Sequence, residues 1–174
     1  MKVLFRTILF TAVIFALFSQ SSEAQFRQRG NWLGPVLTLA TDPIGFGVQY
    51  EHGISPNIGI GGIIRYWGKT VDVYWGDYSW SIIMPQFQGA YHFMPGDQVD
   101  PYAGARLGWA IYSVDIGNET FDTDDGGLFL TAYGGLRYFF NPKIAVNGNI
   151  EFRIAGTDYF NSSLGLTVGA DFTL

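Results

Sequence analysis

The sequence predicts an all-β protein: an eight-stranded antiparallel up-and-down transmembrane β-barrel that follows a cleaved signal peptide. Three observations predict this fold class. Strand-length segments alternate between apolar and polar residues, the connections between them alternate in length, and the chain begins with a secretory signal. A barrel with an apolar outer wall and a polar interior produces this combination of patterns.

The alternation is clearest in the last two segments. Side chains of a β-strand point to opposite faces with a period of two. In 144–154 the apolar face opposes a polar face made of Asn147, Asn149, Glu151 and Arg153. In 164–174 one face carries only apolar residues, namely Leu164, Leu166, Val168, Ala170, Phe172 and Leu174. These strands therefore have one wall suited to hydrocarbon and one wall of small or polar residues.

The first two dozen residues are interpreted as a signal peptide. Lys2 and Arg6 give a positive start, Ile8–Phe18 is an apolar core, and Ser22–Ala24 offers small residues for cleavage. The alternative is a membrane anchor helix, but the apolar core is shorter than the roughly 20 residues that a spanning helix needs. We therefore predict that 1–24 is a signal peptide and that 25–174 forms one barrel domain.

Turn residues divide the mature chain into about eight strands. The expected ranges are 33–41, 45–52, 58–67, 78–93, 101–114, 127–140, 144–154 and 162–174. The second, fourth and sixth connections are tight, whereas the third (Gly68–Asp77) and fifth (Asp115–Gly126) are predicted to be long polar loops. The seventh, Gly156–Asn161, is intermediate, and the short first connection breaks the trend. Short turns at one end and longer loops at the other are typical of membrane barrels.

Aromatic residues are predicted to form two bands at opposite strand ends. Tyr and Trp prefer the membrane interface because their rings are apolar and their polar tips form hydrogen bonds. The alternative is that individual rings belong to a soluble β-core. One expected band contains Trp67, Tyr74, Trp75, Tyr78, Trp80, Tyr112, Tyr159 and Phe160; the other contains Trp32, Tyr50, Tyr91, Phe93, Tyr102, Tyr138 and Phe140.

Composition limits the function further. The chain has no cysteine, so disulfides contribute nothing, and its formal net charge is −5. The acidic residues concentrate in three connecting stretches, and no basic stripe exists, which argues against nucleic-acid binding. No apolar run after Ala24 is long enough for a spanning helix. If the protein stays at a membrane, the barrel wall must hold it there.

These features together resemble the small eight-stranded outer-membrane proteins of the OmpA/OmpX type, over the whole mature region. The resemblance lies in architecture and not in a catalytic motif. It implies a non-enzymatic, porin-like barrel in the outer membrane of a Gram-negative bacterium, with outer-membrane lipids as partners. It also implies recognition of the last strand by the barrel-assembly machinery. The chain ends in Leu174 where the group commonly ends in Phe, with Phe172 on the same face.

The candidate site consists of the charged residues on the polar face of each predicted strand, which is expected to point into the barrel. We expect a polar network that plugs the lumen through Arg–carboxylate pairs, because an eight-stranded barrel leaves barely enough room for side chains and buried charges must be paired. Its members are Glu51, Arg65, Arg106, Arg137, Glu151, Arg153 and Asp171. The alternative use of the same residues is a narrow ion-selective conduit.

Catalytic and metal-binding patterns are weak. His52 and His92 are interpreted as interfacial side chains near one end, out of reach of Ser79 and Ser81 near the other, so no Ser–His–acid relay is expected. The run 122–126 resembles the start of a calcium loop, but Tyr133 occupies the position of the required Glu. We predict no catalytic residues, no cofactor and no metal site. Acidic loops that hold divalent cations loosely remain an alternative, as does an aromatic platform at 75–80 for an extracellular ligand.

Three functions stay open. The leading hypothesis is a non-enzymatic outer-membrane barrel that supports the envelope, contacts the surroundings or passes small solutes. The second is a secreted or periplasmic lipocalin-like barrel, in which the apolar face would turn inward around a hydrophobic ligand. The third is a membrane enzyme that acts on lipid, for which the sequence offers no convincing set of residues.

Overall fold

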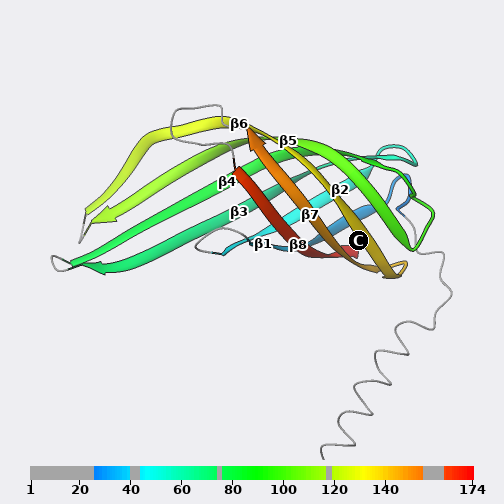
Figure 1. The fold of residues 1–174 in the computed structure, drawn as a ribbon, viewed down its shortest axis with the longest axis horizontal. Helices are drawn as coiled ribbons and strands as arrows, with labels where there is room; N and C mark the ends of the chain where they lie inside the picture. Colours follow the sequence, from blue (N-terminus) through cyan, green and yellow to red (C-terminus); the bar gives the residue numbers. More distant parts are fainter. Residues whose placement is uncertain (1–25, 40–43, 74–75, 117–118, 155–162) are drawn as a thin grey trace, which may run out of the picture.

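In the computed structural model, the described residues form one closed antiparallel barrel in which each strand pairs with its neighbours in sequence, and β1 pairs with β8 (Figure 1). The structure describes residues 26–39, 44–73, 76–116, 119–154 and 163–174. No helix in these ranges has the length and apolar character to cross a membrane. The strands are β1 (Asn31–Leu39), β2 (Gly45–Gly53), β3 (Ile58–Val73), β4 (Gly76–His92), β5 (Val99–Ile116), β6 (Glu119–Asn141), β7 (Ile144–Ile154) and β8 (Ser163–Thr173). The predicted eight-stranded up-and-down barrel is confirmed.

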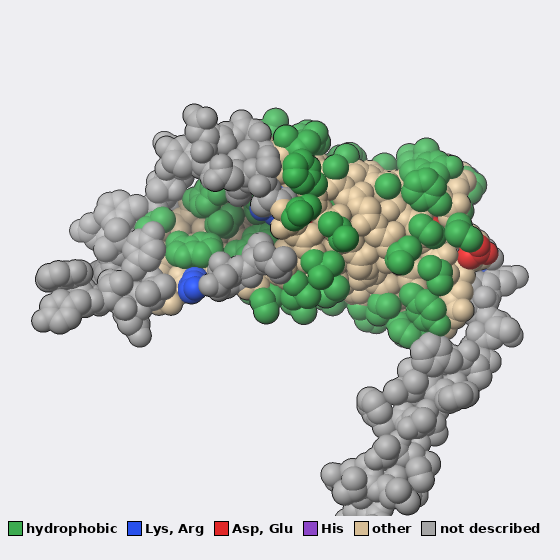
Figure 2. All heavy atoms as spheres, in the orientation of Figure 1, with side chains coloured by type: hydrophobic (Ala, Val, Ile, Leu, Met, Phe, Trp, Pro, Cys, Tyr) green, Lys and Arg blue, Asp and Glu red, His purple; other side chains and the backbone are tan. Residues whose placement is uncertain are grey.

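The apolar wall of the barrel faces outward. Ile150 is 63% exposed, and Phe152, Leu166 and Phe172 on β7 and β8 are exposed as well. Figure 2 shows apolar side chains spread over the outside of the barrel, with few charged side chains among them. The alternate residues point inward, where Asn149, Glu151 and Thr167 are almost completely buried. This exposure contradicts the lipocalin-like alternative, which required the apolar face to line the interior.

Strands β3 to β6 are longer than the sequence predicted. Residues 68–73 extend β3, and the β3–β4 ladder continues to the pair Val73–Gly76. The β5–β6 ladder continues to Ile116–Glu119. The prediction of long polar loops at Gly68–Asp77 and Asp115–Gly126 was therefore wrong. Turn-forming and acidic residues in these stretches suggested loops, but backbone pairing continues through them.

The two extended hairpins, β3–β4 and β5–β6, project beyond the ends of the other strands (Figure 1). They lie at the end of the barrel opposite the start of β1 and the end of β8. The run 122–126 belongs to β6, where the ladder shifts register between Ala110 and Tyr112 of β5. The signal peptide prediction and the connection Gly156–Asn161 lie outside the described residues.

The aromatic bands are only partly as predicted. Tyr50, Tyr91 and Phe93 point outward near the end that holds the termini, as expected. Trp32 and Tyr102 are instead buried inside the barrel at that end. At the opposite end, Trp67, Trp80 and Tyr112 pack inside the barrel around Met84 and Phe129. Exposed rings among the described residues of that half include Phe46 and Tyr66, which are in contact at a centroid distance of 5.2 Å, and Trp109.

Candidate functional site

The centre of the lumen is built around Glu151 of β7, which is 2% exposed. Its Oε2 accepts a hydrogen bond from Arg65 Nη1 of β3 at 2.7 Å. Its Oε1 accepts from Arg106 Nη1 of β5 at 2.5 Å and from Thr167 Oγ1 of β8 at 2.7 Å. We call these four residues the Glu151 cluster. One carboxylate thus joins three other strands through charge-assisted hydrogen bonds, which are stronger than neutral ones.

Both arginines of the Glu151 cluster have further partners. Arg65 Nη2 donates to Gln86 Oε1 at 3.3 Å, and Arg106 Nε donates to Gln88 Oε1 at 3.0 Å. The guanidinium carbon of Arg106 lies 3.8 Å from the ring centroid of Tyr133, which is a close cation–π contact. These contacts hold the two cations in place around a single carboxylate.

A second cluster lies nearer the end that holds the termini. Glu51 Oε2 accepts from Arg137 Nη2 at 2.6 Å, and Glu51 Oε1 lies 2.9 Å from His92 Nε2. His92 Nδ1 lies 2.6 Å from Asp100 Oδ2, and Asp100 has no exposed surface. Both imidazole nitrogens of His92 therefore lie within hydrogen-bond distance of a buried carboxylate oxygen.

Asp171 of β8 completes this second cluster. Its Oδ2 lies 2.9 Å from Arg137 Nε as an ion pair and accepts from Asn147 Nδ2 at 2.8 Å. Its Oδ1 accepts from Gln49 Nε2 at 2.6 Å. We call Glu51, His92, Asp100, Arg137 and Asp171 the Glu51 cluster. Glycine makes room for it, since a Cβ at Gly59 would overlap Glu51 Oε1.

Aromatic and aliphatic side chains close the lumen beneath the Glu51 cluster. Phe26, which precedes β1, is 3% exposed and stacks on the His92 ring with a centroid distance of 3.7 Å and an interplanar angle of 11°. It packs with Trp32, Phe139 and Ala145. The segment is tied to the barrel by Arg29 N, which donates to Gly53 O at 2.6 Å.

The opposite end of the lumen is apolar. Trp67, Met84, Ala110 and Phe129 are buried there, and Trp80, Ile82 and Tyr112 pack against them. Arg153 of β7 lies at this level, with its guanidinium carbon 6.0 Å from the Trp67 ring centroid and 5.7 Å from that of Phe129. The cavity lined by residues of the two polar clusters measures only about 10 Å³, close to the space that one water molecule needs.

The structure brings six of the seven predicted network residues into two clusters. Glu151, Arg65 and Arg106 meet in one cluster, and Glu51, Arg137 and Asp171 meet in the other. The guanidinium group of Arg153 lies at the level of the Trp67 and Phe129 rings. Asp100 was missed, although its parity matches that of Tyr102 and Arg106, because the strand was predicted to begin at Pro101.

The structure corrects the predicted position of His92. The interfacial interpretation is wrong for this residue, because its side chain is buried between Glu51 and Asp100. His52 is half-buried, with Nδ1 2.8 Å from Asn31 Oδ1. Ser79 Oγ donates to Thr70 Oγ1 at 2.9 Å. Within the described ranges, no three His, Cys, Asp or Glu side chains are placed to hold a metal ion.

Solved structures with the same fold come from several Gram-negative bacteria. The N-terminal β-barrel domain of Pseudomonas aeruginosa OprF is 14% identical with a TM-score of 0.66, covering 84% of this chain and 98% of that one. Neisserial surface protein A (NspA) is 14% identical with a TM-score of 0.63, covering 83% and 95%. Ail of Yersinia pestis is 14% identical with a TM-score of 0.58, covering 83% and 97%. These likenesses concern the fold.

The family is established by the sequence itself. No curated protein has a sequence that matches this chain. The model of the outer membrane protein beta-barrel domain matches residues 9–172, which is nearly the whole chain. The closed barrel with its apolar outer wall is the architecture that such a domain requires. The chain therefore belongs to the outer membrane protein β-barrel family and resides in the outer membrane.

Proposed function

We propose that this protein is a non-enzymatic, non-conducting barrel that supports the cell envelope and contacts molecules at the cell surface. The observation that carries the proposal is the filled lumen. Two ionic clusters occupy its centre, Phe26 closes one end, and Trp67 with Phe129 fills the other. Side chains that pair with one another in this way connect the strands across the lumen and, among the described residues, leave no open path through it.

The buried charges support a structural role. Removing one member of a buried ionic group leaves the others desolvated without compensation, which costs about 3–5 kcal/mol. A residue under that constraint is poorly placed to bind and release a solute. Limited passage of small solutes, the second candidate, would need the Glu51 and Glu151 clusters to separate, because the cavity that their residues line measures only about 10 Å³.

The projecting hairpins support a role at the surface. By the topology of such barrels, the longer connections face the outside and both termini face the periplasm. The stretches 69–77 and 115–126 carry seven acidic residues and the single base Lys69. Ail was solved with the heparin analogue sucrose octasulfate. Acidic hairpins would repel such a polyanion, so the extracellular partner of this chain is expected to be neutral or cationic.

The last strand supports assembly by the barrel-assembly machinery. β8 presents Leu164, Leu166 and Phe172 outward and pairs with both β1 and β7. Phe172→Asp should lower the amount of folded protein in the outer membrane, whereas Thr173→Asp, on the other face, should lower it less. Equal assembly of the two variants would argue against recognition of this apolar face.

Single-channel recording tests the main proposal. The mature protein, refolded and inserted in planar lipid bilayers, should give no defined unitary conductance. Protein in the same preparation should migrate as the folded, heat-modifiable form, so that a silent trace is not mistaken for failed folding. A reproducible conductance step from the folded protein would contradict the proposal and favour passage of small solutes.

A further inference from the structure

The ladder between β4 and β5 lacks two residue pairs in the middle of the barrel wall. The register passes from Ile83–Ile111 directly to Gln86–Gly108, so the pairs Met84–Ala110 and Pro85–Trp109 are missing. On its other side, Pro85 pairs normally with Ile64 of β3. The interruption therefore affects only the hydrogen bonds that point from residue 85 toward β5.

Proline explains which hydrogen bond is absent. In this register, residue 85 and residue 109 face each other as a pair that exchanges two hydrogen bonds. The Pro85 carbonyl still accepts from Trp109 N, but proline has no N–H to donate in return. The Trp109 carbonyl oxygen therefore lacks its ladder donor, and the neighbouring pair Met84–Ala110, which depends on the same bond, is lost with it.

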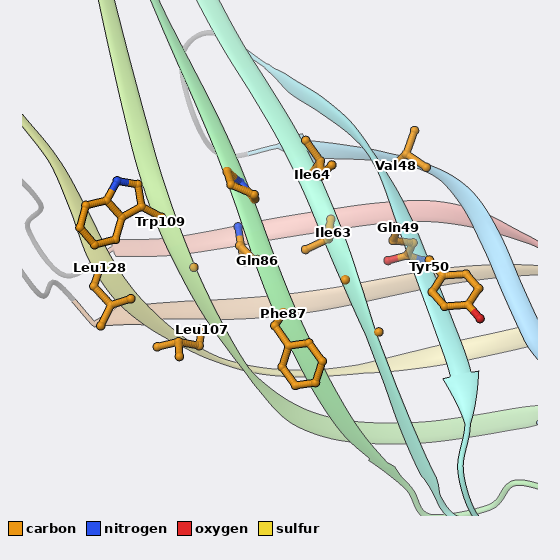
Figure 3. Close-up of a pocket in the computed structure, with 14 residues that line it drawn as sticks. Val48, Gln49, Tyr50, Ile63, Ile64, Gln86, Phe87, Leu107, Trp109 and Leu128 are labelled. Carbon is orange, nitrogen blue, oxygen red and sulfur yellow. The ribbon is translucent and has the colours of Figure 1, made fainter. Parts of the chain in front are cut away.

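This carbonyl lies beside a groove in the outward wall. The groove has a volume of about 640 Å³, with Gly62 and Pro85 among its lining residues. Figure 3 shows the side chains of Phe87, Leu107 and Trp109 standing along it. Phe87 is 62% exposed and Trp109 is 50% exposed. Because Gly62 has no side chain, the outer surface of the barrel is recessed between the side chains of Ile64 and Phe87.

The position in the membrane determines what can occupy the groove. Trp109 is one outward position before Ile111 on β5; Ile111 pairs with Ile83, and Ile83 pairs with Tyr66, whose ring packs on Phe46. Beyond that row, β3 to β6 continue into the projecting hairpins. The groove runs from Trp109 toward Tyr50, which lies near the end that holds the termini, so its Trp109 end is the end nearer the outer leaflet. Water is scarce there, and a backbone carbonyl without a donor is costly in hydrocarbon.

We propose that this groove binds an acyl chain of an outer-leaflet lipid that carries a hydroxyl or amide donor near its carboxyl end. The chain would lie between Ile64, Phe87 and Leu107, and its donor would satisfy the Trp109 carbonyl. A chain with ester linkages alone offers no such donor. The inference concerns the outer wall and is independent of whether the lumen conducts.

The sequence allows this one carbonyl to be observed. Trp109–Ala110 is the only Trp–Ala step in the chain, so [1-¹³C]Trp with [¹⁵N]Ala gives one carbonyl-correlated amide signal. Ala105–Arg106 is the only Ala–Arg step, and in the same register the Ala105 carbonyl faces the Gly89 N–H. Its signal, from [1-¹³C]Ala with [¹⁵N]Arg, is the matched control.

The experiment uses the full mature protein in phosphatidylcholine nanodiscs, titrated with 3-hydroxytetradecanoic acid or with tetradecanoic acid. The hydroxylated chain should move the Trp109 carbonyl ¹³C signal downfield in a saturable manner. The chain without a hydroxyl should not, and the Ala105 signal should stay in place with both. An absent or equal response of Trp109 to the two acids would overturn the proposal.

Two variants complete the test. Pro85→Ala restores the N–H of residue 85, so its Trp109 carbonyl should be hydrogen-bonded at the outset and should not respond. Gly62→Leu should weaken the response of Trp109 because its side chain would occupy the groove; its Cβ would lie 3.2 Å from the Gln86 carbonyl oxygen, so the comparison uses protein that migrates as the folded form. A wild-type carbonyl that is already hydrogen-bonded in phosphatidylcholine alone would mean that water or a second copy of the chain occupies the groove, and would also overturn the proposal.

Discussion

Glu151 on β7 and Arg65 on β3 form an ion pair across the lumen, with Oε2 and Nη1 2.7 Å apart. Their strands are not neighbours in the barrel, so backbone pairing does not hold them together. The ion pair therefore links two strands on different sides of the lumen. Arg106 on β5 binds the other oxygen of the same carboxylate, so Glu151 links β7 to both β3 and β5.

Glu151→Gln should therefore destabilise the barrel strongly. The substitution keeps the size of the side chain but leaves Arg65 and Arg106 without their shared counter-ion, with an expected loss of about 3–5 kcal/mol. Urea-induced unfolding of the protein in lipid vesicles measures this loss. Asp97→Asn is the matched control, because Asp97 is exposed in the turn before β5 and should change stability by less than about 0.5 kcal/mol. Equal effects of the two substitutions would show that the ion pairs of Glu151 with Arg65 and Arg106 do not stabilise the barrel.

Glu51 and Arg137 should be energetically coupled. Their hydrogen bond is 2.6 Å long and both side chains are buried. In a double-mutant cycle with Glu51→Gln and Arg137→Met, the coupling free energy should lie at about 0.5–3 kcal/mol. Unfolding of the four proteins under identical conditions gives this value. Additive losses would mean that the two residues stabilise the barrel independently.

Phe26→Ala should open the end of the lumen that faces the periplasm. Removing the ring deletes the contact with His92 and the packing on Trp32, with an expected cost of about 3–5 kcal/mol. Acrylamide quenching of tryptophan fluorescence should increase as Trp32 becomes accessible. Phe93→Ala, at an outward and exposed position, should leave quenching unchanged. An equal change in both variants would contradict the sealing role of Phe26.

Arginine on the outer wall should be penalised according to depth. Ile150 is in the middle of β7, and Ile150→Arg should cost about 2–4 kcal/mol. Ile44 is also exposed but lies just before β2, near the interface, so Ile44→Arg should cost about 0–1 kcal/mol. Unfolding in lipid vesicles compares the two. A similar cost at both positions would argue against a hydrocarbon environment around Ile150.

The period-two pattern predicted which residues enter the lumen because parity alone decides the face of a strand. Glu51, Arg65 and Glu151 are inside for that reason. The same parity places Trp67 inward, two residues after Arg65, but its aromatic character suggested the interface. Parity says nothing about height along the barrel, so it could not predict that the inward charges meet around two carboxylates, Glu151 and Glu51.

Other features depend on contacts that sequence patterns do not encode. Phe26 lies outside the strands, and only the closed barrel brings it onto His92. The β3–β4 and β5–β6 ladders continue through stretches rich in acidic and turn-forming residues, which suggested loops in the sequence. Pro85 was visible in the sequence, but the carbonyl that it leaves without a donor depends on the register with β5.

The orientation of the outer wall is tested most directly by spin labels, because the chain has no native cysteine to remove. Single labels at Ile150→Cys and Leu107→Cys, in the protein reconstituted in lipid bilayers, report collisions with oxygen and with a water-soluble nickel complex. We expect high accessibility to oxygen and exclusion of the nickel complex at both sites. Labels that the nickel complex reaches, or that neither reagent reaches, would show that this wall does not face hydrocarbon.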